Sequence, residues 1–337
     1  MTNLSPDDIR PPDLEAGKLD ALEEDLVWLR ERRAQFVTVG CPACATASTE
    51  AAPAFEKYGF SFLQCDSCGT AYMSPRATPA ILNEFYTGSR LYAYWDKWIF
   101  PASEAARRER IFRPRVEQTV NLCREHGVKT GTLMEVGAAH GIFCEELMKT
   151  GIFSRVIAVE PGDALSATAR ERGLEVIAAP IDQVDLPDAS IDVVAAFEVI
   201  EHLYDPADFL AHCQRLLTDD GLIIVTCPNY AGFDIQSLGQ ASESLDAEHI
   251  NMFTPDALQR LFERLGFEVL SVTTPGRLDA EIVRNAALSG TIDLSEQPFL
   301  RQVLLDRWDG LGGPFQDFLV ANSLSSHMWM AARVPTR

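Results

Sequence analysis

The chain has 337 residues and a mass of 37.3 kDa, which exceeds one average domain and leaves ample chain for a buried core. It carries 29 Lys and Arg against 49 Asp and Glu, and its net charge of -20 disfavours nucleic acid and anionic lipid as partners. We find neither an apolar run of about 18 residues nor a start typical of a secretory signal. We therefore expect no membrane span and a cytoplasmic protein.

The first 40 residues predict an amphipathic helix. Between Leu14 and Phe36, apolar side chains recur mostly at spacings of three and four, with charged residues between them. We expect this helix to pack onto its own chain, and a short coiled coil that forms a homodimer remains an alternative. The apolar positions are Leu19, Leu22, Leu26, Leu29 and Phe36.

Residues 41–75 contain two Cys-x-x-Cys pairs, and 20 residues separate them. Two such pairs can bring four thiolates around one ion while the intervening segment forms a hairpin, expected near 55–63. Four thiolates leave no open position for water or substrate, so the pattern predicts a structural Zn²⁺ ion. The predicted ligands are Cys41, Cys44, Cys65 and Cys68.

Residues 76–130 form a connector that is rich in aromatic side chains and arginine, with five arginines between Arg107 and Arg115. Such a segment is usually a packed seam with a solvated helix face. The alternative is a lid over a small-molecule substrate, with arginines that bind a phosphate or carboxylate.

From residue 130 onward, apolar strands alternate with helices, which predicts a doubly wound α/β domain with a mostly parallel sheet. Ligands bind such folds beyond the C-terminal ends of the strands. The expected strands are 132–136, 155–160, 174–178, 191–197 and 221–226.

Two features of this domain point to a nucleoside-containing cofactor. The first strand ends in Glu135-Val-Gly-Ala-Ala-His-Gly141, where two glycines allow a sharp turn into a helix. The pattern is shorter than the dinucleotide fingerprint, which argues against a nicotinamide cofactor. About twenty residues later, Glu160 ends the second strand, where a carboxylate can accept hydrogen bonds from both hydroxyls of a ribose.

These segments resemble the motifs of class I S-adenosylmethionine-dependent methyltransferases. The segments 135–141, 159–161, 188–206 and 217–229 are similar to the family's motifs in the family's order. The resemblance implies a seven-stranded Rossmann-like sheet formed by 131–275 and 326–337. Similar enzymes with a four-cysteine zinc ribbon ahead of this fold include deoxysugar C-methyltransferases and enzymes that tailor polysaccharides or natural products.

The resemblance also implies which residues bind S-adenosylmethionine. The backbone at the two glycines would approach the methionine part, Glu160 would bind the ribose, Asp182 would face the adenine, and Phe197 would lie beneath the sulfonium. The implied cofactor-binding residues are Glu135, Gly137, Ala138, His140, Gly141, Glu160, Pro161, Ile181, Asp182, Phe197 and Glu198.

Methyl transfer to a hydroxyl needs a general base, and two Glu-His pairs offer one. The pair Glu248-His249 resembles a segment of sugar methyltransferases in which a histidine faces the substrate, so we expect His249, held by Glu248, to be the base. His202, preceded by Glu201, is an alternative base or a structural residue. Ala247 replaces a histidine found in some of those enzymes, which argues against C-methylation.

The last two expected strands, 267–274 and 328–334, enclose an insertion at 276–325 with expected helices at 278–287 and 299–311. Long insertions in compact domains are usually functional or disordered, so we expect a substrate cover, with dimerisation as the alternative. Candidate substrate contacts in the insertion are Arg277, Asp279 and Arg284.

Together these features predict methyl transfer to a small molecule. The favoured acceptor is a hydroxyl of a sugar, a nucleotide-linked sugar, or a glycan or natural-product intermediate. The alternatives are a sugar C-methyltransferase, a zinc-ribbon rRNA methyltransferase, and a scaffold that has lost catalysis.

Overall fold

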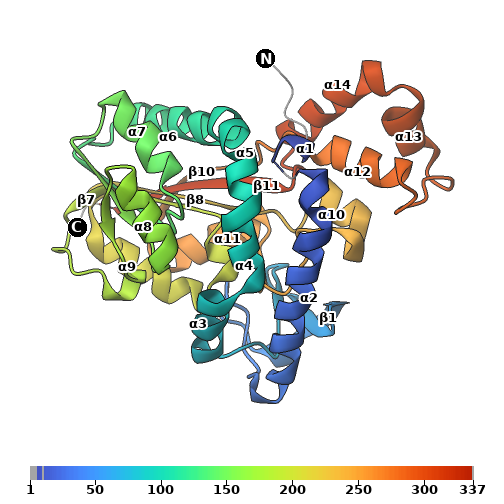
Figure 1. Cartoon of the computed structure of the whole chain (residues 1–337), viewed down its shortest axis with the longest axis horizontal. Coiled ribbons are helices and arrows are strands. Elements are labelled where there is room, and N and C mark those ends of the chain that lie inside the picture. The colour runs from blue at the N-terminus through green and yellow to red at the C-terminus, as the bar shows by residue number, and fades with distance from the viewer. Residues whose placement is uncertain (1–5, 10, 336–337) are drawn as a thin grey trace.

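A computed structural model describes residues 6–9 and 11–335, and its framework consists of two sheets (Figure 1). Residues 1–5, on which the expectation about a secretory signal rests, lie outside this range, as does part of the expected N-terminal unit. The strands are β1 (Ala51–Lys57), β2 (Phe60–Cys65), β3 (Ala71–Met73), β4 (Thr132–Val136), β5 (Arg155–Val159), β6 (Glu175–Ile177), β7 (Ile191–Phe197), β8 (Leu217–Pro228), β9 (Asn251–Met252), β10 (Glu268–Thr273) and β11 (His327–Arg333).

The larger sheet has seven strands in the order β10-β11-β8-β7-β4-β5-β6. Strands β4 to β8 are parallel, and β11 runs antiparallel between β8 and β10. This arrangement confirms the predicted doubly wound, Rossmann-like sheet of seven strands. Strand β8 is longer than expected, because it begins at Leu217 and ends at Pro228.

Helices cover both faces of this sheet. Helices α6 (Arg113–Glu125) and α7 (Ile142–Thr150) pack on one face, and α9 (Pro206–Leu216) and α11 (Pro255–Arg264) pack on the other. Neighbouring strand residues such as Leu133 and Met134 point to opposite faces, and both are fully buried. Helix α8 (Asp163–Glu171) follows β5 and packs beside β6.

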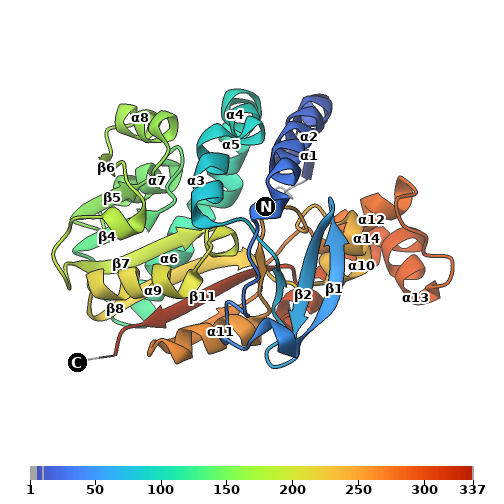
Figure 2. The same ribbon diagram turned by 90° about the horizontal axis from the view of Figure 1, so that it is seen from below.

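The smaller sheet, in the order β1-β2-β3-β9, contains the cysteine-bearing segment together with one short strand from the methyltransferase region. Tyr72 of β3 pairs with Asn251 of β9. Helix α11 lies between β11 and the β1–β2 hairpin (Figure 2). The cysteine unit is therefore joined directly to the doubly wound domain.

Helix α2 (Glu15–Glu31) packs against α4 (Arg90–Tyr94), so the amphipathic helix lies on its own chain. One expected core position is wrong, because Leu19 is 51% exposed. Asp25 is buried instead, and it accepts hydrogen bonds from the Ser89 hydroxyl and from the backbone N–H groups of residues 90 and 91. The N-terminus of α4 requires acceptors, and Asp25 supplies them.

The remaining connector helices are α3 (Pro79–Gly88) and α5 (Phe100–Arg107), and the first described turn is α1 (Pro6–Ile9). No helix in the ranges 6–9 and 11–335 is both long enough and apolar enough to cross a bilayer. Single 3₁₀ turns lie at 12–14, 33–35, 48–50, 181–183, 200–202 and 239–241, and π turns lie at 95–99, 108–112 and 302–306.

The chain between β10 and β11 contains α12 (Asp279–Leu288), α13 (Pro298–Arg301) and α14 (Trp308–Ala321). These helices share an apolar cluster with α10 (Phe233–Leu238) and lie away from α7, α8 and α9 (Figure 1). The expected helix at 299–311 is wrong in its bounds, because the helical path breaks at residue 307 and α14 runs on to 321 through an internal proline. Apolar contacts of α14 within the insertion stabilise the helix although Pro314 in its interior disfavours it.

Candidate functional site

The glycine-rich loop after β4 adopts a backbone that larger residues resist. Gly137 and Gly141 have φ values of 75° and 72°. A Cβ atom at Gly137 would lie 2.6 Å from Val199 Cγ2, and one at Gly141 would lie 2.3 Å from Leu174 Cδ1. Both glycines are therefore required for the close turn that leads into α7.

Glu160, at the end of β5, is held beside this loop by two backbone donors. The N–H of Ala139 donates to Glu160 Oε2 at 2.9 Å, and the N–H of Gly162 donates to Oε1 at 2.8 Å. Burial raises the pKa of Glu160, and these two donors oppose that effect. Each oxygen keeps further acceptor capacity, so the carboxylate fits two ribose hydroxyls. The loop and Glu160 thus suit a nucleoside cofactor.

Glu198 directly follows β7, and three polar side chains lie close to its carboxylate at the C-terminal ends of the strands. Its Oε1 accepts a hydrogen bond from the Thr226 hydroxyl at 2.6 Å and lies 3.4 Å from Arg115 Nη2 and 3.5 Å from His327 Nδ1. Burial raises the pKa of Glu198, but His327, Arg115 and Thr226 together bring it below its usual value. These partners therefore favour the ionised form of the Glu198 carboxylate. The backbone at Glu198 has a positive φ of 56°, which is costly for a non-glycine residue.

Of the partners of Glu198, the sequence reasoning missed His327 and Thr226. Thr226 is the last residue of the expected strand 221–226. A polar side chain at the C-terminal end of a strand is a signal that could have identified it. His327 lies far along the chain, and only the pairing of β11 with β8 brings it to Glu198. Phe197 is buried beside this group, and the Arg115 guanidinium lies 4.9 Å from the centre of its ring.

The other predicted cofactor-binding residues near the loop differ in how far they are buried. Glu135 is buried, its carboxyl accepts a hydrogen bond from the Cys144 thiol at 3.1 Å, and burial raises its pKa to about 8. Ala138 is buried in the loop, whereas Pro161 and Asp182 are exposed. Ile181 begins a 3₁₀ turn after β6. Contact of Asp182 with an adenine remains a prediction.

His140, in the glycine-rich loop, contacts two residues of the connector. Its Nε2 lies 2.7 Å from Asp96 Oδ1, and its ring centre lies 4.3 Å from that of Phe100. Asp96 lies in the π turn between α4 and α5, and Phe100 is the first residue of α5. The connector therefore touches the candidate cofactor loop, as a lid requires, although the lid role itself remains a prediction.

The arginine cluster of the connector is mostly neutralised within the chain, contrary to the alternative of a free anion site. Arg108 contacts Glu104, Glu145 and Glu146 at 2.5–2.8 Å. Arg113 contacts Glu146 at 3.0 Å and also Glu109. The pairs Arg110–Asp8 and Arg107–Ile9 tie the connector to α1. Among the five arginines, Arg115 is the one whose described contacts lie at the strand ends.

A second cluster lies just beyond β7 and combines Glu201, His202 and His249. The imidazole rings of His202 and His249 are 4.8 Å apart, and His202 Nε2 lies 4.0 Å from Glu201 Oε1. Glu201 is fully buried, and neither carboxylate oxygen has a hydrogen-bond partner among the described residues. Burial and then the nearby Glu198 raise the pKa of Glu201 well above its usual value.

His249 is held by its own loop and not by Glu248, so the expected Glu248–His249 interaction is wrong. His249 Nδ1 lies 2.8 Å from the carbonyl oxygen of Ser244, and its backbone N–H donates to Asp246 Oδ1 at 2.7 Å. Because a carbonyl oxygen only accepts hydrogen bonds, Nδ1 donates this one, which in the neutral imidazole leaves the lone pair on Nε2. Glu248 interacts with Tyr92, and burial raises the pKa of Glu248 to about 8.

Two buried residues that the sequence reasoning missed bring the two histidines together. The Asn251 amide donates to the carbonyl oxygens of Leu203 at 2.7 Å and Ile200 at 3.3 Å. Arg76 donates to Asn251 Oδ1 at 2.7 Å and to the carbonyl oxygen of Tyr204 at 2.8 Å. These bonds fix the loop after β7 against β9, and therefore fix His202 against His249.

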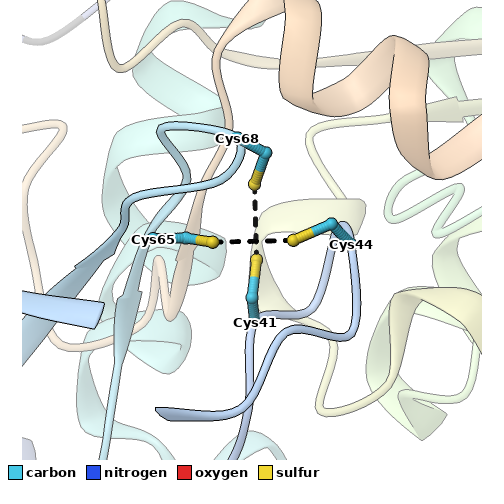
Figure 3. A group of neighbouring side chains, drawn as sticks. All are labelled: Cys41, Cys44, Cys65 and Cys68. Carbon is cyan, nitrogen blue, oxygen red and sulfur yellow. Dashed lines mark hydrogen bonds between the residues drawn. The ribbon is translucent and has the colours of Figure 1, made fainter. Parts of the chain in front are cut away.

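The four cysteines of the small sheet converge as a metal site requires (Figure 3). The Sγ atoms of Cys41 and Cys68 are 3.5 Å apart, and so are those of Cys44 and Cys65. Zn–S bonds of about 2.3 Å in a tetrahedron would place the sulfur atoms about 3.8 Å apart, so the donor set fits Zn²⁺.

The two cysteine knuckles have matching local structures. A threonine hydroxyl lies 3.1 Å from the second sulfur in each case, Thr46 beside Cys44 and Thr70 beside Cys68. The hydrogen bond between the sulfurs of Cys41 and Cys68 lowers the pKa of Cys68 to about 4 and raises that of Cys41, so it favours the thiolate form of Cys68 alone.

Helix α11 holds both knuckles. Arg260 donates to the carbonyl oxygen of Ser67 at 2.6 Å, and Arg264, one turn later, donates to that of Ala43 at 3.1 Å. The cysteine unit is thereby fixed to the methyltransferase domain next to the strand that follows His249.

Two of the three candidate substrate contacts in the insertion, Asp279 and Arg284, make contacts within the insertion. Asp279 is buried and accepts hydrogen bonds from Ser325 at 2.6 Å and Gln316 at 2.7 Å, and its contact with substrate remains a prediction. The Arg284 guanidinium lies 5.0 Å from the centre of the Trp308 ring. Arg277 is exposed.

Comparison with known proteins finds similarity to methyltransferases in the same region. Residues 106–272 match the family model described as a methyltransferase domain. A "Probable S-adenosylmethionine-dependent methyltransferase" of Mycobacterium tuberculosis is 38% identical over 103 residues, which cover 30% of this chain and 37% of that protein. A similarly named protein of Mycolicibacterium smegmatis is 33% identical over 139 residues, which cover 41% of this chain and 52% of its own length.

A relative with a more specific name matches over a longer range. The ubiquinone biosynthesis O-methyltransferase of Rhodopseudomonas palustris is 27% identical over 237 residues, which cover 61% of this chain and 86% of that enzyme. The chain spans only 37% and 52% of the lengths of the two mycobacterial relatives.

Proposed function

We propose that this chain, which contains a methyltransferase domain of the class I S-adenosylmethionine-dependent type, transfers a methyl group from S-adenosylmethionine to a hydroxyl of a small molecule. The acceptor that we favour is a sugar, a nucleotide-linked sugar, or a glycan or natural-product intermediate. The observation that carries the proposal is the meeting of the glycine-rich loop, Glu160 and Glu198 at one sheet edge, with His249 close by.

The residues around the glycine-rich loop fit the cofactor. Bound S-adenosylmethionine would supply a methyl group on a positively charged sulfur. Gly137 and Gly141 let the backbone approach the cofactor, and Glu160 has acceptor capacity for the ribose hydroxyls. The negative charge of Glu198 would stabilise the sulfonium.

The acceptor hydroxyl must lose its proton, and His249 is the side chain proposed to take part in that step. Its Nδ1 proton is directed to the carbonyl oxygen of Ser244, which leaves Nε2 available. His202 lies against the same ring and would help to place it. Methyl transfer needs little beyond this alignment and deprotonation.

Two observations favour a small molecule over RNA. The net charge is -20, and Arg108 and Arg113, which an RNA-binding surface would use, are paired with carboxylates of the same chain. Oxygen is favoured as the acceptor atom because the Rhodopseudomonas relative is named an O-methyltransferase. Ala247, in place of a histidine found in some sugar C-methyltransferases, argues against carbon.

We also propose that the four cysteines bind one structural Zn²⁺ ion. The converging thiols, the threonine hydroxyls at both knuckles and the complete set of four ligands support this role. A closed coordination sphere has no place for substrate, so this ion would support the fold and not the reaction.

The proposal is tested with purified protein, methyl-labelled S-adenosylmethionine and pools of sugars, nucleotide-linked sugars and polyols. We expect label in one of these pools and binding of S-adenosylhomocysteine. Label in added rRNA would support the RNA alternative, and failure to bind S-adenosylhomocysteine would support the scaffold alternative.

A further inference from the structure

We infer that Glu201, His202 and His249 form a binding site for one exchangeable divalent cation, which binds the acceptor hydroxyl and promotes its deprotonation. The inference rests on the proposed methyl transfer and specifies how the acceptor is activated. It concerns a site separate from the four cysteines.

The three side chains provide a donor set that divalent transition metals bind. One ligand atom from each residue lies within 4.8 Å of the other two. Two imidazoles and a carboxylate suit Zn²⁺, Mn²⁺ or Fe²⁺. Three protein ligands leave open positions for water or substrate, whereas the four thiols close their site. Metal–ligand bonds of about 2.0–2.2 Å would draw the three side chains slightly together.

The buried carboxylate of Glu201 is the strongest indication that this cluster binds a ligand. It is fully buried, and neither of its oxygens has a partner among the described residues. The buried carboxyls of Glu135 and Glu160, in contrast, accept hydrogen bonds from the protein. A buried polar group without a partner is costly whether it is charged or neutral, and a bound cation would remove that cost.

The histidines are arranged as metal ligands commonly are. A carbonyl partner on one imidazole nitrogen fixes the tautomer and leaves the other nitrogen free to ligate, and His249 has this arrangement through Ser244. The side chains of His202 and His249 are 18% and 19% exposed, whereas that of Glu201 is fully buried. Both imidazoles therefore keep some contact with solvent, whereas the carboxylate has none.

The position of the cluster connects it to methyl transfer. Glu201 and His202 form the turn that follows Glu198, the negatively charged residue proposed to lie near the sulfonium. His249 lies two residues before the start of β9, and hydrogen bonds of Asn251 and Arg76 fix β9 to the same turn. An oxygen bound at the cluster therefore lies near the proposed methyl donor.

The step balances without a redox partner. The cation binds the acceptor hydroxyl and lowers the pKa of that hydroxyl, and the proton leaves to water. The resulting oxygen anion attacks the methyl carbon, a C–O bond forms, and the C–S bond breaks to give neutral S-adenosylhomocysteine. A further open position can bind a neighbouring oxygen, so the site favours an acceptor with two adjacent oxygens, such as a sugar diol.

Titration of the purified full-length protein with Mn²⁺, followed by electron paramagnetic resonance, tests the site, because Mn²⁺ prefers oxygen and nitrogen donors to thiolates. We expect one Mn²⁺ per chain in the wild type. Glu201→Gln and His249→Ala should each weaken Mn²⁺ binding at least 10-fold while S-adenosylhomocysteine still binds. Glu135→Gln, a second buried glutamate, and His212→Ala on α9 should leave Mn²⁺ binding unchanged.

Absence of stoichiometric Mn²⁺ binding in the wild type, or equal binding in Glu201→Gln, would overturn the inference. Full turnover after removal of all exchangeable metal would overturn it too, and methyl transfer with His249 as a free base would then stand. Conversely, Mn²⁺ bound at this cluster without methyl transfer to any small molecule would refute the proposed function and the activating role, because no acceptor is then activated.

Discussion

The Arg76 guanidinium donates a hydrogen bond to the side-chain oxygen of Asn251 at 2.7 Å, and this contact joins two parts of the chain that are 175 residues apart. Arg76 follows the cysteine unit, and Asn251 lies two residues after His249. Both side chains are almost completely buried. The position of the proposed catalytic histidine therefore depends on how the cysteine unit packs against the methyltransferase domain.

Replacement of Asn251 by alanine should disturb this connection. The change leaves Arg76 and the carbonyl oxygens of Leu203 and Ile200 without a buried partner, so we expect a loss of about 1–3 kcal/mol of unfolding free energy, together with lower turnover. Urea unfolding measures the first effect. As a control, Asn121→Ala, which removes one exposed hydrogen bond on α6, should change stability by less than about 0.5 kcal/mol.

Replacement of Glu160 by alanine should weaken binding of S-adenosylhomocysteine by about 10- to 100-fold, because hydrogen bonds to a charged group contribute about 1.5–3 kcal/mol. Isothermal titration calorimetry provides the affinity. Glu175→Ala, which removes an exposed ion pair with Arg155 on the neighbouring strand, serves as the control and should bind normally. Equal affinity in the Glu160 variant would contradict the assigned role.

Replacement of His249 by alanine should lower turnover by about 10²-fold or more, with binding of S-adenosylhomocysteine unchanged. The expectation holds whether His249 acts as a free base or as a ligand of the proposed cation. The matched control is His212→Ala, because His212 lies on α9 and contacts Asp208 at the surface. Turnover at the wild-type rate in the His249 variant would exclude this residue from catalysis.

Purified protein should retain about one zinc per chain after dialysis against a chelator that removes the exchangeable cation. Cys65→Ser and Cys68→Ser should lose this zinc and unfold at lower denaturant concentration, because the binding free energy of a structural zinc contributes to folding. Cys213→Ala, at a buried cysteine distant in sequence from both knuckles, should keep the zinc. Zinc content is measured by inductively coupled plasma mass spectrometry.

The ion pairs of the connector should make stability depend on acid pH. Burial raises the pKa of Glu146, but Lys149, Arg113 and Arg108 together lower it from 4.5 to about 2. A lowered pKa in the folded state means that Glu146 stabilises the protein fully above pH 4.5, and that this contribution is lost as the pH falls toward 2. When the pH is lowered from 4.5 toward 2, the free energy of unfolding should therefore fall less in Glu146→Gln than in the wild type.

Local patterns in the sequence were sufficient to predict the large sheet and the convergence of the four cysteines, whereas the cofactor-binding residues remain predictions. Alternating apolar strands and helices identify a doubly wound sheet because both faces of a parallel sheet must be covered. The positive φ values at Gly137 and Gly141 explain why glycine was an informative signal there. The cysteine spacing was equally informative because a knuckle is a local structure.

Features that depend on distant partners could not be predicted in this way. Asp25 is buried because it accepts hydrogen bonds at the N-terminus of α4. Leu19 is exposed, although its spacing places it on the apolar side of the helix. The arginines of the connector resembled an anion site until their glutamate partners on α7 were located. Asn251 and His327 carry no local signal, since each gains its role through strand pairing.

The central claim is that the chain methylates a small molecule, and the most direct test follows the methyl group itself. Purified protein is incubated with methyl-labelled S-adenosylmethionine and a cell extract, which is then separated into small molecules and glycans, RNA, and protein. We predict label among the small molecules or glycans that disappears with His249→Ala. Label confined to RNA would contradict the account and would make the cysteine unit a candidate nucleic-acid contact.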